Sequence, residues 1–463
     1  MNRCLYKNNE YKYQKQEIDL NSFVVALFLA LFFLAFAVLQ FGNSLTVLQA
    51  ISFSINGIFI YLMLFRGLSK FSFSIDLIHS VFCLLFFWIA PILQVSSGFN
   101  AWGLSVKEND IIRANIFILL WLMFYNIGAL CCNGSSWKAK QCSYSVVSKK
   151  LIYVILFAMV IITLNYIRKN GLDFGKNSFV ETETQSIGLL LNHCITAFVT
   201  FGTIIIINWA RQTKQNKIFI IVSIVCLLLS CFPTAMSRYA AGSIYCCLLL
   251  TLIPWFREKH RMVMILLIGM AVLFPIMDLY RYKSFSEVTL SDIQNQFANL
   301  SEYFSSGNYD AYQMIIAATR SVEKVGHTYG NQLLGTLFFF FPRKFWSNKP
   351  VSTGTYIANT LGWDFGNISS PLLAEAYVDF GVLGIVFFAI FCGYMINKID
   401  NTYWNGEKSK LSFINLIYFY IVPYFLFVCR GSLMSTWAYL FANIFVLFVL
   451  EKTVDKFEEK QRN

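Results

Sequence analysis

The sequence is dominated by apolar runs of about 20 residues, separated mostly by short polar segments. A run of this length crosses the ~30 Å hydrocarbon layer of a bilayer as an α-helix, which satisfies its own backbone hydrogen bonds. Only 13% of the residues are charged and 57% are hydrophobic, whereas a soluble protein of this length carries about a quarter charged residues. The chain is therefore predicted to be an all-α polytopic membrane protein.

About twelve transmembrane helices are expected from the apolar runs, with boundaries set by where the polar residues begin. The first run is too long for a signal-peptide core and is expected to remain as a span. The expected spans are 22–40, 45–64, 73–93, 111–132, 150–166, 187–209, 217–234, 238–256, 262–279, 372–396, 411–429 and 434–451.

One connection is much longer than the others and divides the chain into three parts. These are an N-terminal membrane bundle of about nine spans (1–279), a large loop (280–370) and a C-terminal membrane bundle of about three spans (371–463). Loops of this size are usually functional or form small domains. Within the loop, Asp310–Val325 has the apolar spacing of an amphipathic helix, and the apolar run Gly330–Phe341 is too short to span.

The distribution of basic residues predicts the orientation. Most of the 37 Lys and Arg residues lie in alternate short connections and at the two ends of the chain, so both termini are expected in the cytoplasm. The large loop is then external, and in a bacterial cytoplasmic (inner) membrane it faces the periplasm. The same placement explains the net charge of +12 without nucleic acid as a partner.

Several common kinds of enzyme site are absent from the sequence. There is no GxxxxGK[ST] or GxGxxG loop, no HExxH and no DxD cluster in the large loop, and the 4 histidines are scattered. We therefore expect no metal site and no cofactor.

Cations at the external ends of spans and in the large loop are the main candidate binding groups, because the positive-inside rule disfavours them there. Arg238 and Arg430 each lie at a span end in a stretch otherwise poor in charge. The guanidinium fork suits phosphate oxygens, so these cations are candidate ligands of a lipid diphosphate. The alternative for an arginine at a span end is a headgroup anchor, and the alternative for Arg320 is the solvated face of the loop helix. The remaining candidates are Arg281, Arg320, Arg343 and Lys349.

Three carboxylates near the loop are candidates for acid–base chemistry. Glu375 and Asp379 lie at the start of the tenth expected span, where one complements the helix dipole and the other is the leading acid–base candidate. Asp310 is either a second acid–base candidate or the N-cap of the loop helix.

Taken in order, these residues resemble those of the O-antigen and capsule repeat-unit polymerases, the Wzy-type family. The resemblance rests on Ser237–Arg238, on the loop helix that opens at Asp310, on a PRxxWxxKPxxxG stretch from Pro342 and on an ExYxxFGxxG stretch from Glu375. It covers about residues 236–385, with the many-span layout as supporting analogy.

The resemblance implies a membrane glycosyltransferase that joins oligosaccharide repeat units carried on undecaprenyl diphosphate. Arg238, Arg343 and Lys349 would then contact the substrate, and Glu375 and Asp310 would orient or deprotonate the acceptor hydroxyl. Trp346 and Tyr377 are candidates for contact with sugar. Membrane lipids and a chain-length regulator protein are further candidate partners.

Two other functions remain open. An O-antigen ligase shares the layout of many spans and one large external loop. A lipid-linked oligosaccharide flippase also has about twelve spans, but usually with short loops and cations inside the bundle.

Overall fold

The computed structural model describes most of the chain as helices. The described residues are 45–137, 147–171, 186–214, 217–280, 283, 287–299, 302–303, 306–406 and 412–462. Within these ranges there is no β-strand, which confirms the all-α prediction. The expected first span, 22–40, and the candidate residue Arg281 lie outside them.

Ten helical segments of the described part of the chain are long and apolar enough to cross a membrane. This finding confirms the multi-pass character of the chain but not the expected number of twelve spans. The run expected at 238–256 forms α9 (Arg238–Leu252), which has only 15 residues because Pro254 opens a separate 3-10 turn, η4 (Pro254–Arg257). The ten segments are α2 (Val47–Lys70), α3–η1–α4 (Ile75–Leu84, Leu85–Ile89 and Ala90–Ser97), α5 (Glu108–Cys131), α6 (Lys149–Asn170), α7 (Ser186–Thr213), α8 with η3 (Ile218–Ser230 and Pro233–Ala235), α10–η5–α11 (Arg261–Ile268, Gly269–Leu273 and Phe274–Leu279), α17 (Leu372–Asn405), α18 (Phe413–Arg430) and α19 (Leu433–Arg462).

Hydroxyl side chains fix the starts of several of these helices. Thr46, Ser74, Ser237 and Ser412 occupy N-cap positions, and each side chain accepts a hydrogen bond from a backbone N–H of the first turn. This bond satisfies one of the donors that a helix start leaves without a partner. The apolar runs therefore begin as helices at defined residues.

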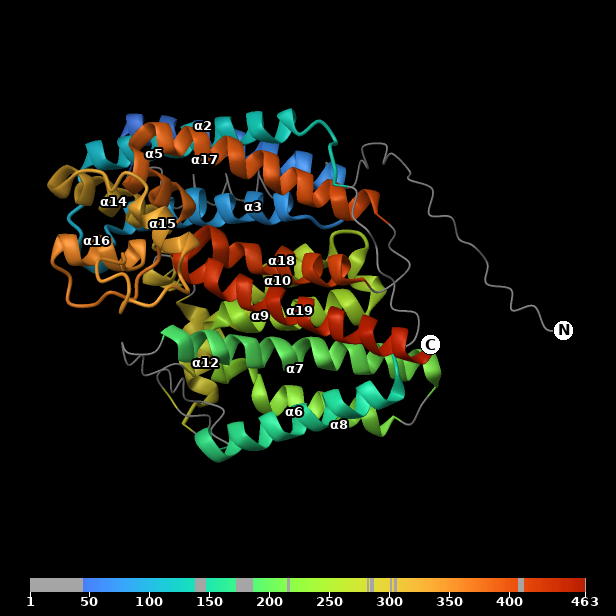
Figure 1. Cartoon of the computed structure of the whole chain (residues 1–463). Helices are drawn as coiled ribbons and strands as arrows, with labels where there is room; N and C mark the ends of the chain where they lie inside the picture. The colour runs from blue at the N-terminus through green and yellow to red at the C-terminus, as the bar shows by residue number, and fades with distance from the viewer. Residues whose placement is uncertain are drawn as a thin grey trace.

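The spanning segments run side by side and define two ends of the molecule (Figure 1). The helices of the large loop gather at one end, called here the loop end, and the C-terminus lies at the other, called the far end. At the far end, Ser72 donates to the carbonyl of Arg257 at 2.7 Å and Trp404 donates to the carbonyl of Phe73 at 3.1 Å. The connections that the sequence assigned to one side are thus brought together.

The elements of the large loop pack on the bundle at the loop end (Figure 1). The helix expected at Asp310–Val325 is present as α14, but its first nine residues are buried all round because it packs against α5, α16 and α17. The apolar run from Gly330 forms only the seven-residue α15. The short elements at this end are η2 (Ala101–Gly103), α12 (Leu290–Ala298), η6 (Gly307–Tyr309), α14 (Ala311–Val325), α15 (Asn331–Leu337) and α16 (Thr353–Leu361).

α17 is longer than the span expected at 372–396 and has a kink near its start. Gly381 has φ 65° and ψ −148°, a conformation that glycine adopts readily and that ends the regular helix after Phe380. The residues before the kink, which include Glu375, Tyr377 and Asp379, form a short helical piece at the loop end. The residues after it continue to Asn405 at the far end.

Candidate functional site

Arg238 stands at the first turn of α9 and is bound by groups from the large loop. Its Nη1 donates to the Tyr303 hydroxyl and its Nη2 to Asn308 Oδ1, each at 2.7 Å. Asp278, at the end of α11, lies 3.4 Å from Nη1 and accepts a 3.0 Å hydrogen bond from the Asn308 amide. The Arg238 charge is thus compensated by one carboxylate.

Arg430 reaches the same part of the loop from the end of α18. Its Nη2 lies 2.9 Å from Asp310 Oδ1 and 3.3 Å from the carbonyl oxygen of Gly307. Ser369 donates to the same Asp310 oxygen at 2.7 Å. Asp310 occupies the N-cap position of α14, but its side chain makes no capping bond there. Its partners come from elsewhere in the chain, so the N-cap alternative does not describe this side chain.

The two arginines therefore meet at residues 307–310, although they are far apart in the sequence. The guanidinium of Arg430 also lies over the ring of Tyr239, 5.7 Å from its centroid, and Tyr239 is the residue after Arg238. Three of the residues expected at the site, Arg238, Arg430 and Asp310, are thereby brought together.

Glu375 is buried at the same end and is bound only by neutral donors. Its two oxygens accept hydrogen bonds from the Thr353 hydroxyl, from the Ser432 hydroxyl at 3.0 Å and from the Leu433 backbone N–H at 2.9 Å. These donors belong to the starts of α16 and α19. Among the described residues, no cation pairs with Glu375.

Asp379, the other carboxylate of this piece of α17, serves the start of α15. It accepts hydrogen bonds from the Thr328 hydroxyl at 2.5 Å and from the backbone N–H groups of Gln332 and Leu333 at 3.1 and 2.9 Å. An anion at a helix N-terminus satisfies open donors and complements the helix dipole. Both carboxylates thus bind donors at helix starts, Asp379 at α15 and Glu375 at α16 and α19.

Arg343 and Lys349 bind backbone carbonyls of their own segment. Arg343 donates to the carbonyls of Lys349 and Pro350 at 2.7 and 3.3 Å, and Lys349 donates to those of Phe339 and Phe341 at 2.5 and 3.0 Å. Burial, and then the neighbouring Arg343 charge, lowers the pKa of Lys349 below its ordinary value.

The other expected residues have separate surroundings. Arg320 pairs with Asp110 at 2.7 Å, at the start of α5. The ring of Tyr377 packs on Phe117, with 4.9 Å between centroids. Trp346 is half-buried in the segment that follows α15. None of these three contacts the cluster around Asp310 in the described structure.

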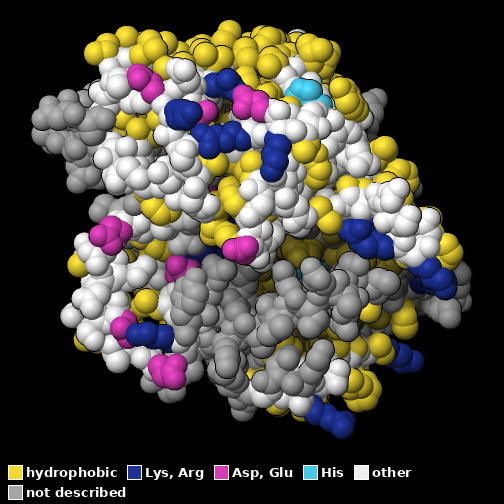
Figure 2. Space-filling model, turned by 90° about the vertical axis from the view of Figure 1, so that its left-hand side faces the viewer, with side chains coloured by type: hydrophobic (Ala, Val, Ile, Leu, Met, Phe, Trp, Pro, Cys, Tyr) yellow, Lys and Arg dark blue, Asp and Glu magenta, His cyan; other side chains and the backbone are white. Residues whose placement is uncertain are grey.

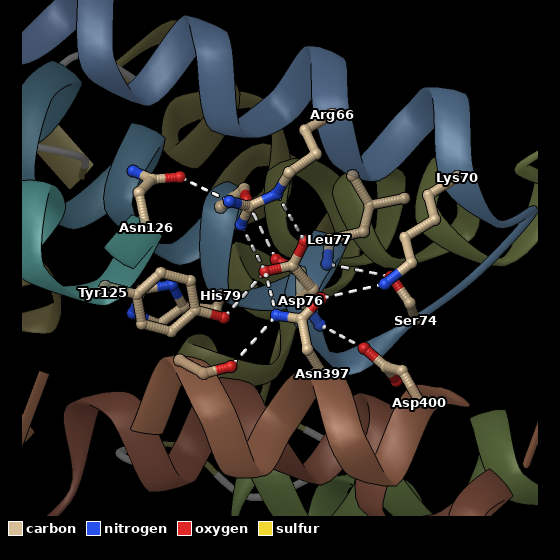
Figure 3. Close-up of polar contacts among 12 residues, drawn as sticks. Arg66, Lys70, Ser74, Asp76, Leu77, His79, Tyr125, Asn126, Asn397 and Asp400 are labelled. Carbon is tan, nitrogen blue, oxygen red and sulfur yellow. Dashed lines mark hydrogen bonds and ion pairs between the residues drawn. The ribbon is translucent and has the colours of Figure 1, made fainter. Parts of the chain in front are cut away.

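A second polar cluster, which the sequence did not predict, is buried near the far end (Figure 3). Arg66 from α2 binds Asp76 from α3 through two nitrogens, at 2.7 and 3.3 Å. The Tyr125 hydroxyl donates to Asp76 at 2.8 Å, and Lys70 donates to Asn397 at 3.0 Å. Asp400 accepts from the N–H groups of Ile75 and Asp76 at 2.9 and 3.0 Å, and from the Tyr418 hydroxyl at 2.6 Å.

The charged residues of this cluster can be read in the sequence, but their meeting cannot. Arg66 and Asp400 fall between the expected spans, and Asp76 lies near the start of the span expected at 73–93. Because α17 continues to Asn405, Asn397 and Asp400 lie inside the helix bundle and face the start of α3.

Seen from the loop end, the molecule carries basic and acidic side chains close together in the upper part of the view (Figure 2).

No group of three or more His, Cys, Asp and Glu side chains that suits a metal ion occurs within the described ranges. The sequence matches no protein-family model, and comparisons with curated proteins and with solved structures gave no match.

Proposed function

We propose that this chain is a glycosyltransferase of the cytoplasmic membrane of a bacterium that polymerises oligosaccharide repeat units carried on undecaprenyl diphosphate into O-antigen or capsular polysaccharide. The observation that carries the proposal is the meeting of Arg238 and Arg430 at the Asp310 segment, at the same end of the bundle as the buried Glu375. One end of the bundle thus carries both kinds of group: cations that can bind a diphosphate and carboxylates that can accept a proton.

The reaction assigns a task to each kind of group. The bond between the sugar anomeric carbon and the diphosphate oxygen breaks, and a bond from an acceptor hydroxyl oxygen to that carbon forms. The diphosphate leaves as an anion, which fixed arginines stabilise in the transition state. The hydroxyl proton passes to a carboxylate, for which Glu375 is the first candidate and Asp310 the second.

The ion pairs of the two arginines set a condition on substrate binding. Arg238 and Arg430 are compensated by Asp278 and Asp310, so a diphosphate has to replace or share these contacts. Arg238 has the longer pair, at 3.4 Å, and its hydrogen bonds to Tyr303 and Asn308 use neutral acceptors. We therefore assign the first phosphate contact to Arg238.

The orientation follows from the same proposal. The flipped, lipid-linked repeat units are on the outer face of the membrane, so the loop end is external and both termini are cytoplasmic. In support, the connections rich in Lys and Arg lie at the far end, as the positive-inside rule requires for a cytoplasmic side.

One observation favours a second candidate, a flippase for lipid-linked oligosaccharides. The cluster of Arg66, Asp76 and Asp400 places charges inside the bundle, as transporters often do. Flipping does not require the large loop or the arrangement of arginines around Asp310, so polymerisation stays the first proposal.

The purified protein in proteoliposomes tests the proposal directly. The substrate is the lipid-linked repeat unit extracted from a strain that lacks this gene, and the product is separated by size. The wild type should form a ladder of longer lipid-linked chains, and Arg238→Ala should lower the rate about 100-fold or more. Lys324→Gln, which changes another exposed cation of the loop end, should leave the rate unchanged. Equal rates in all three proteins would contradict the diphosphate contact of Arg238.

A further inference from the structure

Residues 331–349, called here the α15 segment, expose an unusual amount of apolar surface for a part of the chain outside the spanning helices. Exposed side chains of this size and density mark a contact with a partner or a membrane, because water disfavours them. The large apolar side chains that are 41–74% exposed are Leu334, Leu337, Phe338, Phe340, Phe341 and Phe345.

Contacts with α19 place this segment at the side of a spanning helix. The ring of Phe339 lies 5.5 Å from that of Phe441, whose side chain is 44% exposed in the middle of the apolar part of α19. Phe441 follows Leu433, the first residue of α19, by eight positions, which is about 12 Å along the helix axis. The α15 segment therefore extends along the side of α19, from the loop end toward the middle of the bundle, on a surface that faces lipid.

Close packing holds the segment in this position. A Cβ on Gly335 would lie 2.3 Å from Pro350 Cγ and 2.8 Å from Met434 Cε, so α15 is pressed against the start of α19. The start of α15 is fixed by Asp379, and Lys349 donates to the Phe339 and Phe341 carbonyls after its end. Backbone carbonyls that leave a helix near lipid need such donors.

The basic residues of the segment have no acidic partners. Arg343 and Lys349 bind only carbonyl oxygens, and Lys344 is exposed without a bonding partner within the described part of the chain. Three positive charges next to exposed aromatic rings match the headgroup layer of an anionic membrane.

We propose that the α15 segment is a membrane-interface anchor that binds anionic phospholipid headgroups of the leaflet at the loop end. Its phenylalanines enter the acyl region, and Lys344, with Arg343, binds the lipid phosphate. The occupant is bulk phospholipid and not the diphosphate of a substrate, because these side chains are exposed on the outside of the bundle. Glu375 and Asp310, in contrast, are 3% and 1% exposed inside it.

The test titrates phosphatidylglycerol into the full-length protein in neutral detergent and follows the rise of its unfolding temperature. Lys344→Gln should weaken the apparent affinity about fivefold, because one headgroup charge contact is lost, and Lys344→Glu should weaken it further. Lys344 makes no bond within the described protein, so these variants leave the fold intact. Lys324→Gln is the control, since Lys324 is an exposed cation of the same end whose side chain donates to the carbonyl of Thr360 in α16.

Equal affinities in the wild type and in all three variants would overturn the anchor. A second titration uses undecaprenyl diphosphate in place of phosphatidylglycerol. If only the diphosphate stabilises the protein through Lys344, the segment binds substrate and the phospholipid assignment is wrong. If the Lys344 variants lose phosphatidylglycerol binding and the control keeps it, the anchor is established whether or not the chain polymerises sugars.

Discussion

The two carboxylates buried at the far end are stabilised in different ways. Asp76 forms a two-nitrogen ion pair with Arg66, whereas Asp400 pairs with no cation among the described residues and accepts its bonds from the start of α3 and from Tyr418. A buried charge is costly unless it is paired and hydrogen-bonded, and each carboxylate satisfies that requirement with partners from another helix. Single side chains therefore join α2, α3, α17 and α18.

Removing Asp76 should be much more costly than removing an exposed carboxylate. Asp76→Ala removes the carboxylate that pairs with Arg66 and is expected to lower the free energy of unfolding by about 3–5 kcal/mol. Glu323→Ala breaks the Arg113 pair, whose side chains are 44% and 56% exposed, and should cost about 1 kcal/mol or less. Unfolding in mixed micelles, titrated with a denaturing detergent, measures both. Similar values for the two variants would show that the far-end cluster contributes no stability.

Glu375 provides the second residue-scale prediction. If it is the base, Glu375→Gln should lower the polymerisation rate by about 10²–10⁴-fold, because the amide cannot accept the proton. Glu375→Asp keeps a carboxylate and should retain more of the activity. Both variants are assayed with the lipid-linked repeat unit and checked for an unchanged unfolding temperature. Equal and mild losses would assign Glu375 to fixing the starts of α16 and α19, where its hydrogen bonds lie.

At the scale of elements, α5 and α17 pack so closely that a Cβ added to a glycine of either helix would collide with the backbone of the other. A Cβ on Gly128 would lie 2.1 Å from the carbonyl oxygen of Ile390, and one on Gly393 would lie 2.1 Å from that of Tyr125. Small residues allow backbones of neighbouring membrane helices to approach in this way. The contact also brings Tyr125 of α5 to the Asp76 cluster.

Adding one methyl group at this contact should separate the helices. Gly128→Ala and Gly393→Ala are each expected to cost about 1–3 kcal/mol or more of unfolding free energy, since the neighbouring backbone has to move. Gly269→Ala is the matched control, because a Cβ there meets nothing within 4 Å. It should be neutral, or stabilising by up to about 1 kcal/mol. The same detergent titration compares the three variants, and a loss at Gly269 as large as at Gly128 would refute the packing argument.

Elements were predictable from the sequence where composition alone decides them. Ten of the expected spans, the helix at 311–325 and the long loop needed only runs of apolar residues and their spacing. The extension of α17 to Asn405 was not predictable, because Asn397 and Asp400 resemble connection residues and are buried only through contacts with α3. Likewise, the sequence offered Arg238, Arg430 and Asp310 as candidates but did not predict the pairing of Arg430 with Asp310, because these residues are 120 positions apart.

At the scale of the whole molecule, the structure has two ends with different chemistry. The loop end holds the start of α9 with Arg238, the end of α18 with Arg430, and the residues Asp310 and Glu375 at the starts of α14 and α17. The far end holds the C-terminus and the Arg66 cluster at the start of α3. A polymerase that works on exported lipid-linked sugars needs the residues of the loop end at the outer face of the membrane. The proposed orientation is therefore part of the function.

Labelling of single cysteines tests the orientation. In a cysteine-free background, Lys344→Cys at the loop end should react with a membrane-impermeant maleimide applied to spheroplasts. Glu258→Cys, in the exposed far-end connection after η4, should react only after the membrane is opened. The reverse pattern would place the loop end in the cytoplasm and exclude polymerisation at the outer face.

The most direct measurement of the central claim is a gel of surface polysaccharide from a strain in which this gene is deleted. Loss of the long-chain ladder, with core plus a single repeat unit remaining, is the result that a polymerase predicts. A normal ladder would contradict the account. Loss of every repeat unit from the lipid A core would also contradict it, and would indicate a ligase, or a flippase if lipid-linked repeat units accumulate on the cytoplasmic face.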